Sequence, residues 1–336
     1  MSITYSQAIV PSNTSSPLTQ LLTEEERVQI TDIALRLAEL VWRDDSQAQI
    51  RDLLFQYVRA ALRVKEPPTL AHYTTFVGVQ GIVEADTIWA NDITKQSDAT
   101  EAQYGQQLII DATRAAPQDT RIHNFREAIT RVIAAPVVSA HAYSTSLSLH
   151  EDIAEQWRRY GDWGRGYSIV VDTTKINKTV NLLSLRVLYD RDEQRVVIQT
   201  LVRALEIMLW RIRHTRGFIS EEIGKNILTE VTTVLHLFFV PAMKAAHFSS
   251  EREWRYVATE WEGQDHINLP PSVHGGPSRR DLLLTSPAGI SPIVSIRSGP
   301  CASPDNTEIL RQLLNAKGLS HVQIVPSDLD CSRLCP

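Results

Sequence analysis

The sequence lacks the features that mark several well-defined protein classes. It has only three cysteines in 336 residues, Cys301, Cys331 and Cys335, and an odd number of late cysteines is not a disulfide framework. No second Cys or His pair stands beside Cys331 and Cys335, so a zinc site is not expected. We therefore expect no metal, no disulfide framework and a reducing compartment.

An excess of basic charge is also missing. The 34 Lys and Arg residues and 39 Asp and Glu residues give a formal net charge of −5, whereas nucleic-acid-binding domains usually carry a strongly basic surface. General binding to nucleic acid is therefore not expected, although a local basic groove is compatible with any net charge.

Long apolar runs are absent as well. The most apolar stretch, 231–240, is too short to span a bilayer. The N-terminus has neither the basic start nor the apolar run of a signal peptide. These absences predict a cytoplasmic protein with no membrane partner.

Motifs of common enzyme classes are missing too. The sequence contains no serine-hydrolase elbow, no P-loop and no His-Glu-X-X-His. The glycine-rich segment 161–166 precedes a predicted strand, whereas a phosphate-binding loop precedes a helix. We interpret this segment as a tight turn.

The residues that are present predict an α+β fold. Residues 1–22 are rich in Ser, Thr and Pro and are predicted to be flexible. Helical spacing of apolar residues predicts a helical hairpin over 23–66, ended by Pro67 and Pro68. The main domain, 69–336, mixes predicted strands with helices irregularly and carries a helical insert at about 192–246. This pattern favours mixed or antiparallel sheets with inserted helices. We also predict that residues 1–66 can be deleted without destroying the remaining fold.

Four ordered segments carry a resemblance to a known family. They are His72-Tyr-Thr with Gly81-Ile-Val and Ile88-Trp-Ala; Ser144-Thr-Ser with Gln156-Trp-Arg158 and Gly164-Arg-Gly-Tyr167; Glu251-Arg-Glu-Trp-Arg255; and Ser298-Gly-Pro300. In this order they resemble an uncharacterised bacterial domain-of-unknown-function family across most of residues 70–336. The family implies no activity.

A more distant resemblance does imply one. His72, the Ser-Thr-Ser at 144–146 and the Glu-X-Glu at 251–253 occur in the order of three motifs in proteins with the ADP-ribosyltransferase fold. This resemblance implies NAD as substrate, with His72 on a ribose hydroxyl and the Ser-Thr-Ser strand around nicotinamide. It implies Glu253 beside the ribose that loses nicotinamide, and Glu251 toward the acceptor.

The chemistry of these residue types agrees with that role. Breaking the bond to nicotinamide builds positive charge on the ribose, which a nearby carboxylate stabilises. Strand alternation predicts Glu251, Glu253 and Arg255 on one face. Tyr73, Tyr143 or Tyr167 would stack on a ring of NAD, and Arg residues bind phosphate.

The candidate catalytic residues are Glu253, Glu251 and His72. The candidate NAD-binding residues are His72, Tyr73, Thr74, Ser144, Thr145, Ser146, Arg158, Arg165 and Tyr167. We predict that His72, Ser144 and Glu253 converge on one pocket.

Each candidate also has a purely structural interpretation. His72 would be a hydrogen-bonded core residue, the Ser-Thr-Ser a strand end, and Glu251 and Glu253 an ion-pair ladder. The leading hypothesis is an NAD-using ADP-ribosyltransferase-like enzyme, by analogy a bacterial toxin or phage-defence effector whose acceptor is unknown. The alternative is a non-catalytic nucleotide-sensing or protein-interaction module. A nucleic-acid-processing enzyme is a third option.

Overall fold

The computed structural model describes residues 24–40, 46–62, 66–93, 99–115, 123–134, 140–176, 182–216, 221–261, 271–272 and 276–334. The predicted flexible segment 1–22 lies outside these residues. The chain divides into two compact units that interleave along the sequence. Unit 1 comprises Met1–Val64, Ser97–His141 and Leu185–His247, and unit 2 comprises Lys65–Gln96, Ala142–Ser184 and Phe248–Pro336.

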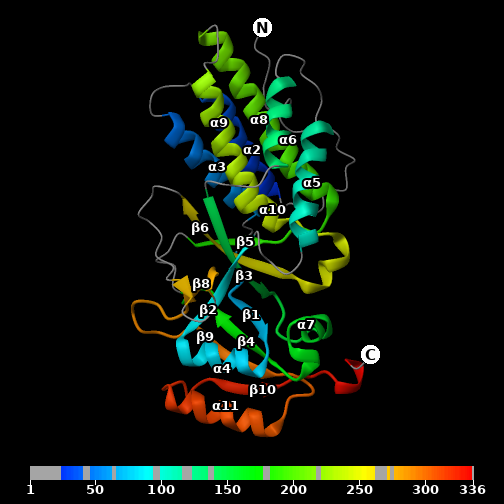
Figure 1. Cartoon of the computed structure of the whole chain (residues 1–336), viewed down its shortest axis with the longest axis vertical. Coiled ribbons are helices and arrows are strands. Elements are labelled where there is room, and N and C mark those ends of the chain that lie inside the picture. Colours follow the sequence, from blue (N-terminus) through cyan, green and yellow to red (C-terminus); the bar gives the residue numbers. More distant parts are fainter. Residues whose placement is uncertain are drawn as a thin grey trace. The chain divides into compact units, whose positions relative to one another are not determined.

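The described secondary structure of unit 1 is mostly helical (Figure 1). Its helices are α2 (Glu24–Glu39), α3 (Ser46–Leu62), α5 (Ala99–Ala115), α6 (His123–Ile133), α8 (Arg191–Arg216) and α9 (Glu221–Val234), followed by a π-helical turn (Leu235–Phe239) and α10 (Val240–Ala242). The helix α2 packs against α3 and α8, and α3 packs against α9. The predicted hairpin and the two long helices of the predicted insert are thus present, and they lie in the same unit.

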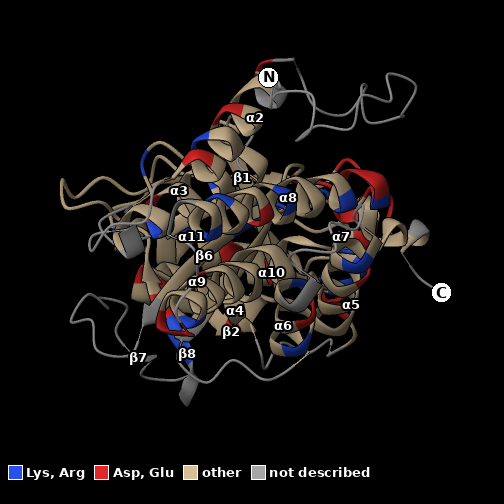
Figure 2. Ribbon diagram, turned by 90° about the horizontal axis from the view of Figure 1, so that it is seen from above, with Lys and Arg blue, Asp and Glu red and all other residues tan. Residues whose placement is uncertain are grey.

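Buried ion pairs tie these helices together. Arg126 of α6 donates two hydrogen bonds to the Glu206 carboxylate of α8, and both side chains are buried. Arg51 of α3 binds both oxygens of Glu230 in α9. The ribbon colours of Figure 2 show acidic and basic residues interspersed along α8. Buried carboxylates are tolerated here because each has a guanidinium partner.

One helical segment of unit 1, Glu221–Ala242, is long and apolar enough to cross a membrane by length and composition alone. However, 67% of its most apolar window is buried inside the structure. The segment also holds Glu230, which is paired with Arg51. Burial and pairing favour a core helix for this segment.

Unit 2 is built around a sheet with the strand order β10-β9-β4-β1-β3-β2-β8-β7. Of the strands off this path, β6 pairs with both β3 and β5. The strands are β1 (Thr69–Thr74), β2 (Thr87–Asp92), β3 (Ala140–Ser148), β4 (Tyr167–Asp172), β5 (Leu182–Arg186), β6 (Glu253–Trp261), β7 (Pro271–Ser272), β8 (Gly276–Leu283), β9 (Ile293–Ser298) and β10 (Gln323–Pro326). Of these, β3 belongs to unit 2 from Ala142 onward, and β5 up to Ser184.

The sheet mixes both pairing types, as the sequence predicted. The strand β10 runs parallel to β9, whereas β1 is antiparallel to both β3 and β4. Among the described residues of this unit, the strands are accompanied by the α-helices α4 (Phe76–Ala85), α7 (Ala154–Arg159) and α11 (Pro304–Ala316). The prediction of an α+β fold is therefore confirmed.

Two glycines of the resemblance motifs, Gly166 and Gly299, lie where backbones come close together. A Cβ atom on Gly166 would lie 2.2 Å from the carbonyl oxygen of Thr74, and one on Gly299 would lie 2.2 Å from that of Gly164. The amide of Gly299 donates to the carbonyl of Gly166 at 2.9 Å. Only glycine allows this approach. The segment 161–166 is a tight turn, as predicted, and includes the 3-10 helix η3 (Asp162–Gly164).

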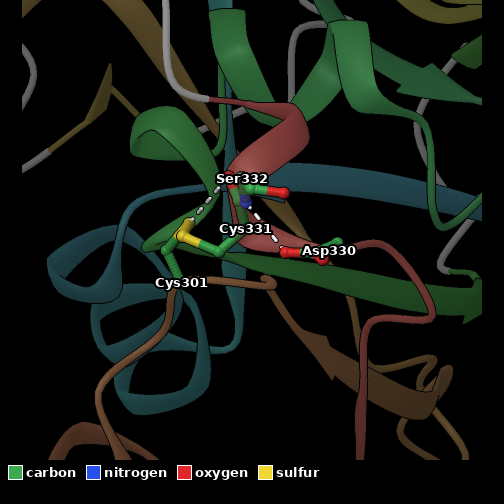
Figure 3. Close-up of a disulfide and its surroundings, with 4 residues drawn as sticks. All are labelled: Cys301, Asp330, Cys331 and Ser332. Atoms are coloured by element: carbon green, nitrogen blue, oxygen red, sulfur yellow. Dashed lines mark hydrogen bonds between the residues drawn. A yellow bond between two sulfur atoms is a disulfide. The ribbon is translucent and has the colours of Figure 1, made fainter.

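The cysteines correct one expectation. Cys301 and Cys331 form a disulfide, with their Cα atoms 5.2 Å apart (Figure 3). No disulfide was expected because the three cysteines are odd in number and all late in the chain. The two bonded residues are 30 positions apart, and spacing alone cannot show that β9, α11 and β10 bring them together. The disulfide also weakens the argument for a reducing compartment, where such bonds are rare. Cys335 lies outside the described residues.

Candidate functional site

His72 lies on β1 and contacts the next strand of the sheet. Its Nδ1 atom is 3.0 Å from the carbonyl oxygen of Ser146 on β3. A carbonyl oxygen can only accept, so Nδ1 carries the proton and Nε2 of the neutral ring is the acceptor. Burial lowers the pKa of His72 below its usual value, which favours this neutral form.

The Ser-Thr-Ser segment occupies β3, as the resemblance implies. Ser144 and Thr145 are buried, whereas Ser146 is exposed. Two residues further along, Ser148 donates from its hydroxyl to the carbonyl oxygen of Glu251 at 2.9 Å. The strand that contacts His72 therefore also contacts the Glu-X-Glu segment.

Glu251 does not share a strand face with Glu253, which corrects the predicted alternation. Glu251 ends a 3-10 turn (Ala246–Glu251), and β6 begins at Glu253. Between them Arg252 has a φ of 48°, in the left-handed region where strand alternation does not hold. Strand alternation therefore places only Glu253 and Arg255 on the same face of β6.

Glu253 and Arg255 form a buried pair on β6. Nε of Arg255 lies 2.6 Å from Oε1 of Glu253, and Nη2 lies 3.0 Å from Oε2. Both side chains are about 5% exposed or less. The paired geometry holds the carboxylate in one orientation.

Glu251 is the centre of a second cluster. Its side chain is only 1% exposed, and Oε1 lies 3.4 Å from Nη1 of Arg159, which is 41% exposed. Gln156 donates to the main-chain carbonyl of Glu251 at 3.0 Å. The Arg159 guanidinium also lies over the ring of Phe248, 5.0 Å from its centre. The Gln-Trp-Arg helix and the Glu-X-Glu segment therefore meet in space.

The sequence predicted Arg158 as a binding residue, whereas it is Arg159 that lies against Glu251. Helical spacing could have identified Arg159, since it is three residues after Gln156 and side chains at that spacing share a face of the helix. Arg158 lies 3.5 Å from Glu155 on the same helix. Arg165 follows η3 and is exposed.

The three remaining candidates support the fold of β1. The Tyr73 hydroxyl donates to the carbonyl of His150 and accepts from the amide of Ile153, both at 2.9 Å. Its ring packs edge-on against Trp157. Thr74 pairs with Tyr167 across β1 and β4, and the buried Tyr167 hydroxyl lies 3.1 Å from that of Thr307. Stacking of either tyrosine on a ring of NAD stays a prediction.

In the part of the chain that the structure describes, no three His, Cys, Asp or Glu side chains are grouped as a metal site.

No curated protein and no solved structure matches the chain. Residues 156–256, which run from the Gln-Trp-Arg helix to the Glu-X-Glu-Trp-Arg strand, do match a family model. Its description is "Protein of unknown function (DUF2971)", which supports the predicted resemblance to an uncharacterised family over these residues.

Proposed function

We propose that unit 2 binds NAD and breaks its bond to nicotinamide, as an ADP-ribosyltransferase-like enzyme. The supporting observation is the strand pairing: β3 pairs with both β1 and β6. These strands carry His72, the Ser-Thr-Ser segment and Glu253. The contact of His72 with Ser146 and that of Ser148 with Glu251 link the three motifs directly.

Each side chain has a chemical role in this proposal. A ribose hydroxyl donates to Nε2 of His72, the acceptor left by the bond from Nδ1. The Glu253 carboxylate stabilises the positive charge that develops on the ribose as nicotinamide leaves. Arg255 is a positioning residue, because it holds both oxygens of Glu253. Arg159, whose Nε donates to Glu155 at 2.6 Å, has a partly exposed guanidinium that would also bind a phosphate group.

One observation favours the non-catalytic alternative. Both oxygens of Glu253 already accept hydrogen bonds from Arg255, so the pair also serves as a buried structural link. In that case unit 2 is a nucleotide-sensing or protein-interaction module that binds without turnover. We also propose a cytoplasmic location, as the sequence analysis expects, and a role as a toxin or phage-defence effector belongs to the catalytic proposal by analogy alone.

Replacing Glu253 with Gln tests the catalytic role. Glutamine keeps the size of the side chain but cannot supply negative charge, so we expect nicotinamide release to fall by at least ~10². Glu206→Gln is a matched control, because Glu206 also forms a buried two-oxygen pair with an arginine, in unit 1. The measurement is nicotinamide release from NAD by the full-length chain, at a temperature where both variants are folded.

The outcomes separate the proposals. Loss of turnover in Glu253→Gln, with activity retained in Glu206→Gln, supports a catalytic Glu253. Equal turnover in Glu253→Gln and wild type removes Glu253 from the chemistry. NAD binding by calorimetry without nicotinamide release supports the sensing module. Magnesium-dependent cleavage of nucleic acid, with neither NAD binding nor release, supports the nucleic-acid-processing option.

A further inference from the structure

The disulfide lies beside the glycine turn of unit 2. Cys301 follows β9, and its amide donates to the carbonyl of Gly164 at 2.8 Å. Cys331 begins η6 (Cys331–Arg333), a short 3-10 turn in which Asp330 accepts from the amide of Ser332 (Figure 3). Both cysteines are only partly buried, so a small thiol reagent can reach the bond.

The segment after β10 carries a buried leucine, Leu334, which we call the plug. The side chain of Leu334 is 1% exposed and joins the core cluster of Ala71, Tyr73 and Trp157. Leu334 also occupies the space beside Gly164, where its Cδ1 would lie 2.5 Å from an added Cβ. The C-terminal segment therefore fills part of the core beneath β1 and α7.

Two polar contacts anchor the start of the same segment. The Ser327 hydroxyl and the Asp328 amide both donate to the carboxylate of Asp152, at 2.7 and 2.8 Å. Asp152 also accepts from the indole nitrogen of Trp157 at 2.7 Å. These bonds lie at the beginning of the segment, whereas the disulfide lies just before Leu334.

Leu334 packs against residues that neighbour the candidate site. Tyr73 follows His72 on β1, and its hydroxyl holds the chain on either side of Asp152. Trp157 belongs to α7, the helix whose Gln156 and Arg159 contact Glu251. A continuous set of contacts therefore runs from Cys331 through Leu334 and Trp157 to Glu251.

We propose that Cys301–Cys331 is a reversible redox modification site that latches Leu334 into the core beneath α7. A dithiol reductant opens the latch: its two sulfurs form a cyclic disulfide, and two electrons and two protons pass to Cys301 and Cys331. After reduction, η6 is held only by non-covalent contacts, and the chain between the cysteines regains conformational freedom. Opening the latch removes the support under α7. This proposal is independent of NAD chemistry.

The test uses the full-length chain with Cys335→Ser, so that only one pair of thiols exists. The oxidised and dithiothreitol-reduced forms are compared by hydrogen exchange and thermal melting. We expect reduction to lower amide protection of residues 328–334 and of α7 by at least ~10-fold, because local opening becomes easier. We expect the melting temperature of unit 2 to fall by about 6–12 °C.

Two variants provide controls. Cys301→Ser in the same background should match the reduced form with or without dithiothreitol. Leu334→Ala keeps the disulfide but removes the plug, so it should lower the protection of α7 without making it sensitive to reductant. Two free thiols after treatment with oxidised glutathione, measured by alkylation and mass spectrometry, would show that the pair does not form. Unchanged protection of α7 on reduction would show that the bond is not a latch. Either result overturns the proposal.

Discussion

A single main-chain contact sets the chemical state of His72. Donation from Nδ1 to Ser146 selects one neutral tautomer, and burial lowers the pKa of the imidazole. His236 in unit 1 has the same combination, with Nε2 3.3 Å from the carbonyl of Val132 and a pKa lowered by burial. Both side chains are therefore neutral at pH 7, and neither contributes a positive charge to its surroundings.

This predicts a specific dependence of stability on pH. The unfolded state binds a proton on each histidine near pH 6.5, whereas the folded state binds it only at lower pH. The stabilising contribution is thus present above pH 6.5 and is lost as pH falls toward the folded-state pKa. Replacing His72 with Gln should reduce the loss of unfolding free energy between pH 7.5 and 5.5, measured with denaturant.

His236→Gln is the matched variant, since it removes the corresponding contribution from unit 1. Nuclear magnetic resonance titration gives a direct check, because the His72 ring should titrate below pH 6.5. A midpoint above that value, or an unchanged pH dependence in His72→Gln, contradicts the assignment of a neutral ring with a lowered pKa.

At the scale of elements, periodicity predicted the strands and helices better than it predicted their ends. The pattern of β6 identifies a strand, but a period of two does not show where that strand begins. Arg252 with its positive φ decides this, and it places Glu251 in a turn. The spacing of Gln156 and Arg159 lies in the sequence, but their contact with Glu251 depends on the sheet that brings the two segments together.

The glycine contacts yield a prediction at this scale. Gly166→Ala places a methyl group against the carbonyl of Thr74, where β1 and β4 pair. We expect a loss of about 1–3 kcal/mol in the free energy of unfolding, the usual cost of overpacking. Gly81→Ala in α4 is the control, since no atom lies within 4 Å of its added Cβ. That change should leave stability unchanged or raise it by up to about 1 kcal/mol. Equal denaturation midpoints for Gly166→Ala and wild type would rule out the close backbone contact.

At the scale of the whole molecule, the sequence indicates one boundary between the two units but not the others. Composition changes at Pro67 and Pro68, close to the division between units at 64 and 65. Nothing in the pattern of α5, α6 or α8 shows which apolar face each helix packs against. The assembly of these helices with the hairpin is a tertiary property, because amphipathic helices of similar period fit many partners. The family match, 156–256, likewise crosses from unit 2 into unit 1 and back.

This assembly makes deletion of residues 1–64 an informative experiment. The hairpin buries Leu37, Leu54, Tyr57 and Leu62, each fully inaccessible to solvent. Each such side chain contributes about 1.5–3 kcal/mol on burial, against a total stability of about 5–15 kcal/mol for a typical domain. We therefore expect the truncated chain to lose the cooperative melt of unit 1 and to bind a hydrophobic dye at the exposed faces of α8 and α9. The sequence alone predicted that this segment is dispensable.

Tyr57→Phe shows whether the hairpin stabilises unit 1 through its buried apolar area or through its hydrogen bond to α8. It removes only the 2.7 Å hydrogen bond from the Tyr57 hydroxyl to the carbonyl of Val197, so it should cost about 1 kcal/mol and leave unit 1 cooperative. If the hairpin stabilises unit 1 through its apolar area, the deletion should cause a large loss of stability and Tyr57→Phe only a small one. Unit 2 should keep its hydrogen-exchange protection in both proteins, because its strands pair with one another. A truncated chain with a cooperative melt of both units would instead show that α8 and α9 are stable without α2 and α3.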